Sequence, residues 1–185
     1  MSDDEQIFKS MTMDEWLNAE NIEDILPNIV GHYKETSKAT IDYNCLSWAV
    51  ELTDTFIDPE NRCVGYSWPD GAEREWTTAA CRKVLAYYGY VEECDDGSFE
   101  DEYVKVAMYV DESGAPTHFA RQIVDGNWTS KLGDFIDVVH HNLSCIEGND
   151  HQHYGTAKYY FKKKGPKSTW PPSEEPLKSL TDSPA

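Results

Sequence analysis

The dipeptide Asn44-Cys45 is the part of the sequence best suited to covalent chemistry. Asparagine is a favoured N-cap residue, so Asn44 is expected to place Cys45 in the first turn of a helix. Unpaired backbone N–H groups and the positive end of the helix dipole stabilise a thiolate there, and they could also bind an oxyanion. Cys45 would share its helical face with Trp48, Ala49 and Leu52, which favours instead a buried thiol without a reactive role. Both interpretations follow from the same spacing.

A base for this thiol must come from a distant part of the sequence, because nucleophile and base meet in space. His118 is the candidate, since it begins a predicted strand at 117–124 directly after the turn at Pro116. A histidine with a purely structural role is the alternative. Asp134, just past the following predicted strand, is the nearest carboxylate that could orient the ring.

Hydrophobic spacing gives the elements that would position these residues. It predicts helices within 13–26, from 44 to 52 and over 76–88, each with apolar residues at helical intervals. Strands are predicted at 104–110, 117–124, 127–132 and 156–164, with a helix at 136–143 between the last two. We therefore expect an α+β fold with its helices on one side of an antiparallel sheet. The expected divisions are an acidic helical segment at 1–26, a domain at 27–164 and a proline-rich tail at 165–185.

These motifs resemble a group of bacterial proteins with a papain-like, NlpC/CHAP-like Cys…His arrangement. The similarity rests on Asn44-Cys45, the strand at 105–110, the Pro-Thr-His-Phe-Ala run at 116–120 and the Gly-Asn-Trp-Thr-Ser-Lys-Leu-Gly run at 126–133, and it covers about 27–164. It implies a papain-like fold in which a central helix carrying Cys45 packs on the sheet that carries His118. The implied activity is a peptidase- or amidase-like thiol hydrolase that acts on an amide or thioester of a peptide-like substrate and needs no cofactor.

The third catalytic position departs from this pattern. Papain-like enzymes orient the histidine with an Asn, Asp, His or Gln on the next strand. A two-residue Asp-Gly turn at 125–126 would pair His118 with Gly133 and bring Thr129 and Lys131 to the face of His118, and none of these accepts a hydrogen bond well. Asp134 is the substitute, and Ser130 would need a register shift of one residue. Lys131 would lower the pKa of a nearby imidazole. The expected site thus comprises a catalytic set and an oxyanion or substrate-binding set: Cys45, His118 and Asp134; Asn44, Ser130, Lys131 and Gln122.

Charge supplies an alternative function. The 185 residues carry 34 Asp and Glu against 16 Lys and Arg, a net charge of −18, which disfavours nucleic-acid and membrane-surface binding. A catalytically inactive papain-like module that binds a basic protein, as an inhibitor or immunity protein does, is therefore the competing interpretation. An acidic mimic of nucleic acid is a third and rests on charge alone. The N-terminus shows no secretory signal, and the five cysteines are an odd number, so we expect a cytoplasmic protein with free thiols.

Two further clusters are expected to be structural. Soft and borderline ligands gather between 140 and 153, but their spacing matches no standard zinc motif, so we expect no metal there. They are His140, His141, Cys145, His151 and His153. The basic run at 162–164 is read as a solvated strand end.

Overall fold

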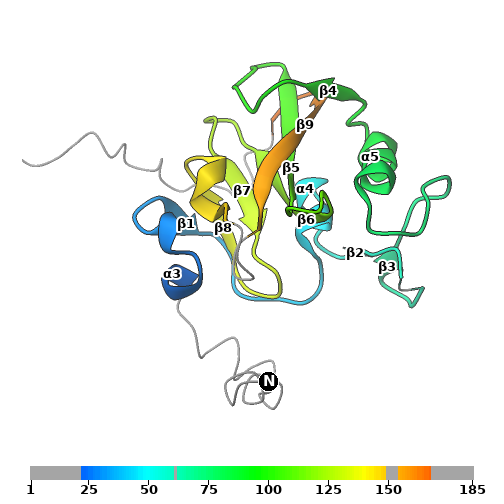
Figure 1. Cartoon of the computed structure of the whole chain (residues 1–185), viewed down its shortest axis with the longest axis horizontal. Coiled ribbons are helices and arrows are strands. Elements are labelled where there is room, and N and C mark those ends of the chain that lie inside the picture. Colours follow the sequence, from blue (N-terminus) through cyan, green and yellow to red (C-terminus); the bar gives the residue numbers. More distant parts are fainter. Residues whose placement is uncertain (1–21, 61, 149–153, 168–185) are drawn as a thin grey trace, which may run out of the picture.

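An antiparallel sheet of seven strands forms the centre of the computed structural model, which describes residues 22–60, 62–148 and 154–167. The strand order is β1-β8-β7-β6-β5-β9-β4, so the last strand inserts between β5 and β4 (Figure 1). The α+β class and the antiparallel sheet are confirmed. The strands are β1 (Tyr33–Glu35), β4 (Glu92–Cys94), β5 (Tyr103–Val110), β6 (Pro116–Gln122), β7 (Trp128–Lys131), β8 (Asp137–His140) and β9 (Thr156–Lys164).

Two helices, α4 (Cys45–Ala49) and α5 (Thr78–Tyr87), cover one face of the sheet. Each begins where a side chain caps it: Asn44 accepts a hydrogen bond from the Ser47 N–H, and Thr77 accepts one from the Ala80 N–H. The predicted start of α4 is therefore confirmed, although this helix ends earlier than expected, and α5 begins two residues later than the predicted 76. The core on this face joins both helices to alternate residues of β5 and β6, among them Val104, Val106, Met108 and Phe119.

The other face is covered as well, which corrects the expectation of helices on one side only. The short helices α3 (Ile22–Ile25), η1 (Pro27–Ile29) and η2 (Leu143–Ile146) supply this second layer. Leu26, Ile29 and Ile146 pack there against Ala107 and Ala120 of the sheet. Figure 1 shows α3 and α5 at opposite sides of the molecule. The described helices include none long and apolar enough to span a membrane.

The predicted helix at 136–143 is wrong. Residues Asp137–His140 form β8, which pairs with β7 and β1, and only the 3-10 turn η2 follows it. All four residues of β8 are buried, and two are β-branched valines. A strand buried on both faces shows no alternation, so its apolar spacing can imitate that of a helix.

The predicted register between β6 and β7 is also wrong, by one residue. Gln122 pairs with Trp128 and Ala120 with Ser130, because the turn spans more residues than a two-residue type I′ turn, with Ile123 N–H donating to Asn127 O at 2.9 Å. A one-residue shift moves every side chain to the other face. Ser130 therefore shares the face of Ala120, and Lys131 faces α4.

The remaining described segments lie around this sheet. Two short strands, β2 (Phe56–Ile57) and β3 (Tyr66–Ser67), form a separate parallel pair. Most of the predicted segments 1–26 and 165–185 lies outside the described residues. Lys167 is described, and its ammonium donates to the carbonyl oxygens of Glu100 and Tyr103.

Candidate functional site

The cap of α4 is rigid. Asn44 Oδ1 accepts hydrogen bonds from the Ser47 N–H at 3.0 Å and the Ser47 hydroxyl at 2.8 Å, while Nδ2 donates to Ile57 O at 2.7 Å. Both ends of the amide are thus used to join α4 to β2. Asn44 is placed where the sequence predicts, and its side chain serves the cap.

Cys45 is a neutral thiol at neutral pH. The residue is half-buried against the core of α4 and α5, and burial raises its pKa to about 11. The backbone N–H groups of Phe119 and Leu46 hydrogen-bond the sulfur and, with the charge of Lys131, act in the opposite direction. The sequence predicted a lowered pKa from the helix N-terminus, but in a helix of five residues desolvation outweighs that effect.

His118 lies on the sheet face opposite to α4. Successive residues of a strand point to opposite faces, so Phe119 and Arg121 face α4, while His118 lies against Tyr109 and Tyr154. The Tyr154 ring lies against it with centroids 4.1 Å apart and planes tilted by 33°. Neither ring nitrogen has a hydrogen-bond partner among the described residues, and the ring is fully buried. The expected hydrogen bond between Cys45 and His118 is therefore absent.

Burial also sets the charge of this imidazole. It lowers the pKa of His118 to about 3, with a smaller contribution from nearby His140, so the ring is neutral. His140 is itself held by two hydrogen bonds: its Nδ1–H donates to Asn142 O at 2.7 Å, and Ser130 Oγ donates to Nε2 at 2.9 Å. Ser130 does reach the face of His118 through the register shift, but it binds the other histidine.

A buried polar layer lies beneath α4, and sequence reasoning missed three of its members, Ser37, Tyr43 and Asp137. The Asp137 carboxylate accepts hydrogen bonds from the Tyr43 hydroxyl at 2.5 Å and the Ser37 hydroxyl at 2.7 Å on one oxygen. Its other oxygen has no partner among the described residues, and burial raises its pKa. The Lys131 ammonium donates to Phe135 O. Burial lowers the pKa of Lys131, and the charge of Asp137 acts in the opposite direction by raising it. Asp137 was missed because its segment was expected to be a helix; nothing in the sequence distinguishes Tyr43.

Tyr154 is the residue that links the two sides of this end of the sheet. Its ring lies against His118, and burial raises the pKa of its hydroxyl, which also lies close enough to Cys45 and Asp134 to interact electrostatically with them. Asp134 also interacts electrostatically with Lys131, but neither ring nitrogen of His118 has a hydrogen-bond partner among the described residues, so Asp134 does not orient the ring. Cys45, Lys131, Asp134 and Tyr154 therefore gather in one region, without a hydrogen-bonded acid–base pair among them.

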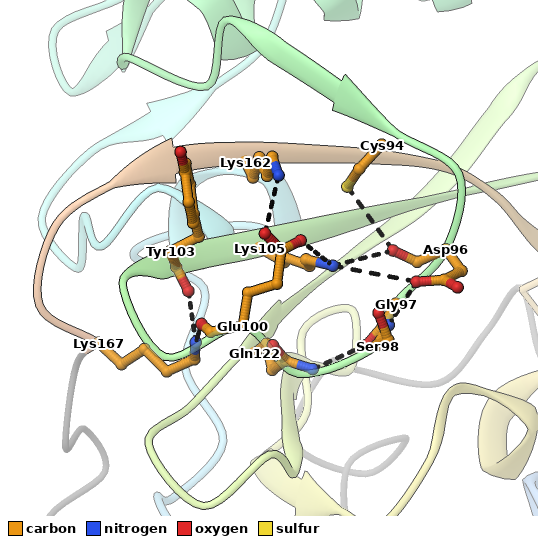
Figure 2. Close-up of polar contacts among 10 residues, drawn as sticks. All are labelled: Cys94, Asp96, Gly97, Ser98, Glu100, Tyr103, Lys105, Gln122, Lys162 and Lys167. Atoms are coloured by element: carbon orange, nitrogen blue, oxygen red, sulfur yellow. Dashed lines mark hydrogen bonds and ion pairs between the residues drawn. The ribbon is translucent and has the colours of Figure 1, made fainter.

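Gln122 lies at the other end of β6 and anchors a loop. Its Nε2 donates to Gly97 O at 2.9 Å (Figure 2). Nearby, the Glu100 carboxylate contacts the ammonium of Lys105 at 2.8 Å through one oxygen and that of Lys162 at 2.8 Å through the other. Lys105 is only 1% exposed, so this loop carboxylate balances a buried charge. The Gln122 side chain thus makes a structural contact, its predicted role in substrate binding stays a prediction, and Lys162 is paired.

A surface depression of about 410 Å³ opens beside the cap of α4, between the segments around 41, 54 and 66. Phe56 and Tyr66 form an aromatic pair in it, with centroids 5.0 Å apart and planes tilted by 43°. Asp42 and Asp54 add two carboxylates, and neither has a lysine or arginine within ion-pair distance in the described part of the chain. The lining is completed by Ile41, Thr53 and Gly65. The hollow is acidic and aromatic.

Comparison with protein families gives one match, to a domain of unknown function (DUF7689), over residues 34–162. The chain belongs to this family. The matched range includes every residue discussed above from Ser37 to Lys162, but not Lys167. The comparison with curated proteins gives no match, and the comparison with solved structures gives none either.

The soft and borderline ligands between 140 and 153 have other partners or lie outside the described residues. His140 is held by Ser130 and Asn142, and the Cys145 thiol lies 3.4 Å from the Asn142 side-chain oxygen. His151 and His153 belong to the segment that is not described. Within 22–60, 62–148 and 154–167 no three His, Cys, Asp or Glu residues are arranged to hold a metal ion.

Proposed function

We propose that this protein is an acidic recognition module that binds a basic polypeptide, in the manner of an inhibitor or immunity-type protein. The observation that carries the proposal is the depression beside α4, where two carboxylates without a cationic partner flank an aromatic pair. Such a surface favours cations, because carboxylates attract them and ring faces bind them through their quadrupole.

The net charge supports the same conclusion at longer range. A protein of net charge −18 attracts a basic partner before contact and accelerates its association, and this effect weakens as salt rises. We propose further that the scaffold is a papain-like one in which α4 is retained and the catalytic function is not. Support for this comes from the neutral Cys45 thiol and from His118, whose ring nitrogens have no described partner.

The test compares charge removal inside and outside the depression. Binding of an (Arg-Gly)₄ peptide is measured by calorimetry at 50 and 300 mM salt. The double variant Asp42→Asn/Asp54→Asn should weaken binding about tenfold, because two charge contacts worth up to about 1 kcal/mol each are lost. Glu35→Gln/Glu112→Gln removes the same charge from exposed sites elsewhere and should change affinity less than twofold. Equal losses in both doubles would show that only general charge attracts the peptide and would refute the proposal.

A thiol hydrolase remains the second candidate, because of the groups around the Cys45 sulfur. Two backbone N–H groups and the Lys131 charge stabilise its thiolate, as a nucleophile on an amide or thioester would require. Iodoacetamide labelling at pH 7 separates the candidates. A recognition module should be labelled first at exposed Cys63, while a hydrolase should be labelled first at Cys45. Cys45→Ala should leave peptide binding intact in the first case and abolish activity in the second.

A further inference from the structure

We infer that the depression beside α4 recognises arginine side chains of its partner in preference to lysine. The inference rests on the proposed function and deepens it, since a basic partner could present either residue. Three features of the described structure carry it: the paired rings, the two separate carboxylates, and the way this molecule already binds its own cations.

The chain contains an internal example of the arrangement. The Arg82 guanidinium lies 4.7 Å from the centroid of Tyr159 and 5.8 Å from that of Phe161, and it is paired with the Glu93 carboxylate. One arginine thus contacts two rings and an acid together. Each lysine–ring contact in the described residues involves a single ring, as does the contact of Arg121 with Trp48; the lysine pairs are Lys131–Tyr43, Lys158–Tyr159, Lys162–Tyr103, Lys163–Tyr90 and Lys167–Phe99.

The depression offers the same components without the cation. Phe56 and Tyr66 form a two-ring surface, and Tyr66 is 38% exposed, so one of its sides remains accessible. Asp42 and Asp54 come from different segments of the rim. A planar guanidinium can lie on a ring and donate from several N–H groups in different directions, whereas an ammonium is a compact, strongly hydrated charge. Two carboxylates beside two rings therefore match arginine better.

The size of the hollow fits one such residue. Its volume of about 410 Å³ is near the lower end of the range of about 300–1,000 Å³ that holds small ligands. This is room for a single long side chain and the backbone that bears it. The partner we infer is therefore a basic segment that inserts one arginine, with its other charges outside the depression.

Three pentapeptides test the inference: acetyl-Gly-Gly-X-Gly-Gly-amide with X as arginine, lysine or citrulline. Citrulline keeps the shape of arginine and removes its charge. Binding is followed by NMR titration of the backbone amides of Thr53, Gly65 and Tyr66. We expect the arginine peptide to bind at least threefold more tightly than the lysine peptide and at least tenfold more tightly than the citrulline peptide.

Two variants locate the effect. Tyr66→Leu removes one ring and should make arginine and lysine peptides bind alike, while Asp54→Asn should weaken both. Glu112→Gln is the matched control and should change neither. Equal affinity for arginine and lysine in the unaltered protein would overturn the arginine preference and leave the proposed function standing. No shift at these amides with any cationic peptide, while (Arg-Gly)₄ binds elsewhere, would overturn both.

Discussion

Acidification should destabilise this protein strongly between pH 6.5 and 5, because two histidines are buried in neutral form. Neither His118 nor His140 is exposed, and burial lowers their pKa values to about 3 and about 4. His118 has no described acceptor for an added proton. A proton on His140 would fall on Nε2, where Ser130 now donates a hydrogen bond.

The direction and size of the change in the free energy of unfolding with pH follow from proton linkage. Histidines in the unfolded chain have a pKa of about 6.5, so they become protonated below that pH. In the folded protein His118 and His140 stay neutral until the pH falls to about 3 and about 4, so protonation favours the unfolded chain. The stabilisation is complete above pH 6.5 and is lost as pH falls. Below pH 6.5, each of the two histidines lowers the free energy of unfolding by about 1.4 kcal/mol per pH unit. At pH 5 the loss is about 2 kcal/mol for each and about 4 kcal/mol for both, a large part of a typical folding free energy of about 5–15 kcal/mol.

Urea unfolding at pH 7, 6 and 5, followed by tryptophan fluorescence, measures this loss. The window ends at pH 5 because most carboxylates titrate below it. His118→Phe keeps an aromatic ring against Tyr154 and cannot titrate, so its loss between pH 7 and 5 should be about half that of the unaltered protein. The reasoning is refuted if the free energy of unfolding is unchanged from pH 7 to 5, or if the variant loses as much as the original chain.

Three other substitutions test the fold around the sites by thermal or urea unfolding. Asn44→Ala removes the cap of α4 and should cost about 1–2 kcal/mol; no change would show that the cap is dispensable. Gly155→Ala should prevent stable folding, because the new Cβ would lie 2.1 Å from a backbone oxygen of β5, whereas Gly114→Ala, also at positive φ but in open space, should cost only about 1–2 kcal/mol. Glu100→Gln should lower the melting temperature, because buried Lys105 loses its 2.8 Å ion pair and keeps only the Asp96 carboxylate at 4.0 Å as a described ion-pair partner, and adding Lys105→Met should recover most of the loss; a double variant less stable than Glu100→Gln would contradict this.

Local signals were sufficient for much of the fold. The start of α4 at Asn44-Cys45, the start of α5 near Thr77 and the strands of the β5–β6 hairpin follow from caps, helical spacing and β-branched runs. These features depend on a few neighbouring residues, so the sequence is enough to predict them. The helix prediction over segment 137–140 was wrong because the burial of this segment comes from strands and helices far away in the chain.

The candidate site required information that local patterns do not contain. Whether His118 meets Cys45 depends on which sheet face receives α4, and this is decided by packing of the whole core. Two adjacent residues of β6 differ in their position relative to Cys45. Phe119 contacts the Cys45 sulfur through its N–H, and the side chain of His118 lies on the other face of the sheet. The turn at Asp125-Gly126 added a register error of one residue, which exchanged the faces of Ser130 and Lys131. Residue types can be read from the sequence, but the orientation of their side chains cannot.

The same cap that suggested catalysis instead fixes the proposed binding surface. Asn44 ties α4 to Ile57, and Ser47 Oγ accepts the Ile57 N–H at 3.0 Å, so the strand that carries the neighbouring Phe56 is held against the helix. On the other side, Tyr43 is anchored to buried Asp137, which fixes the chain next to Asp42. The aromatic and the acidic walls of the depression therefore depend on one set of buried hydrogen bonds. Affinity increases when a site is ordered before its ligand arrives, because less conformational entropy is lost on binding. The buried hydrogen bonds that hold α4 in place thus also order the surface that we propose binds the partner.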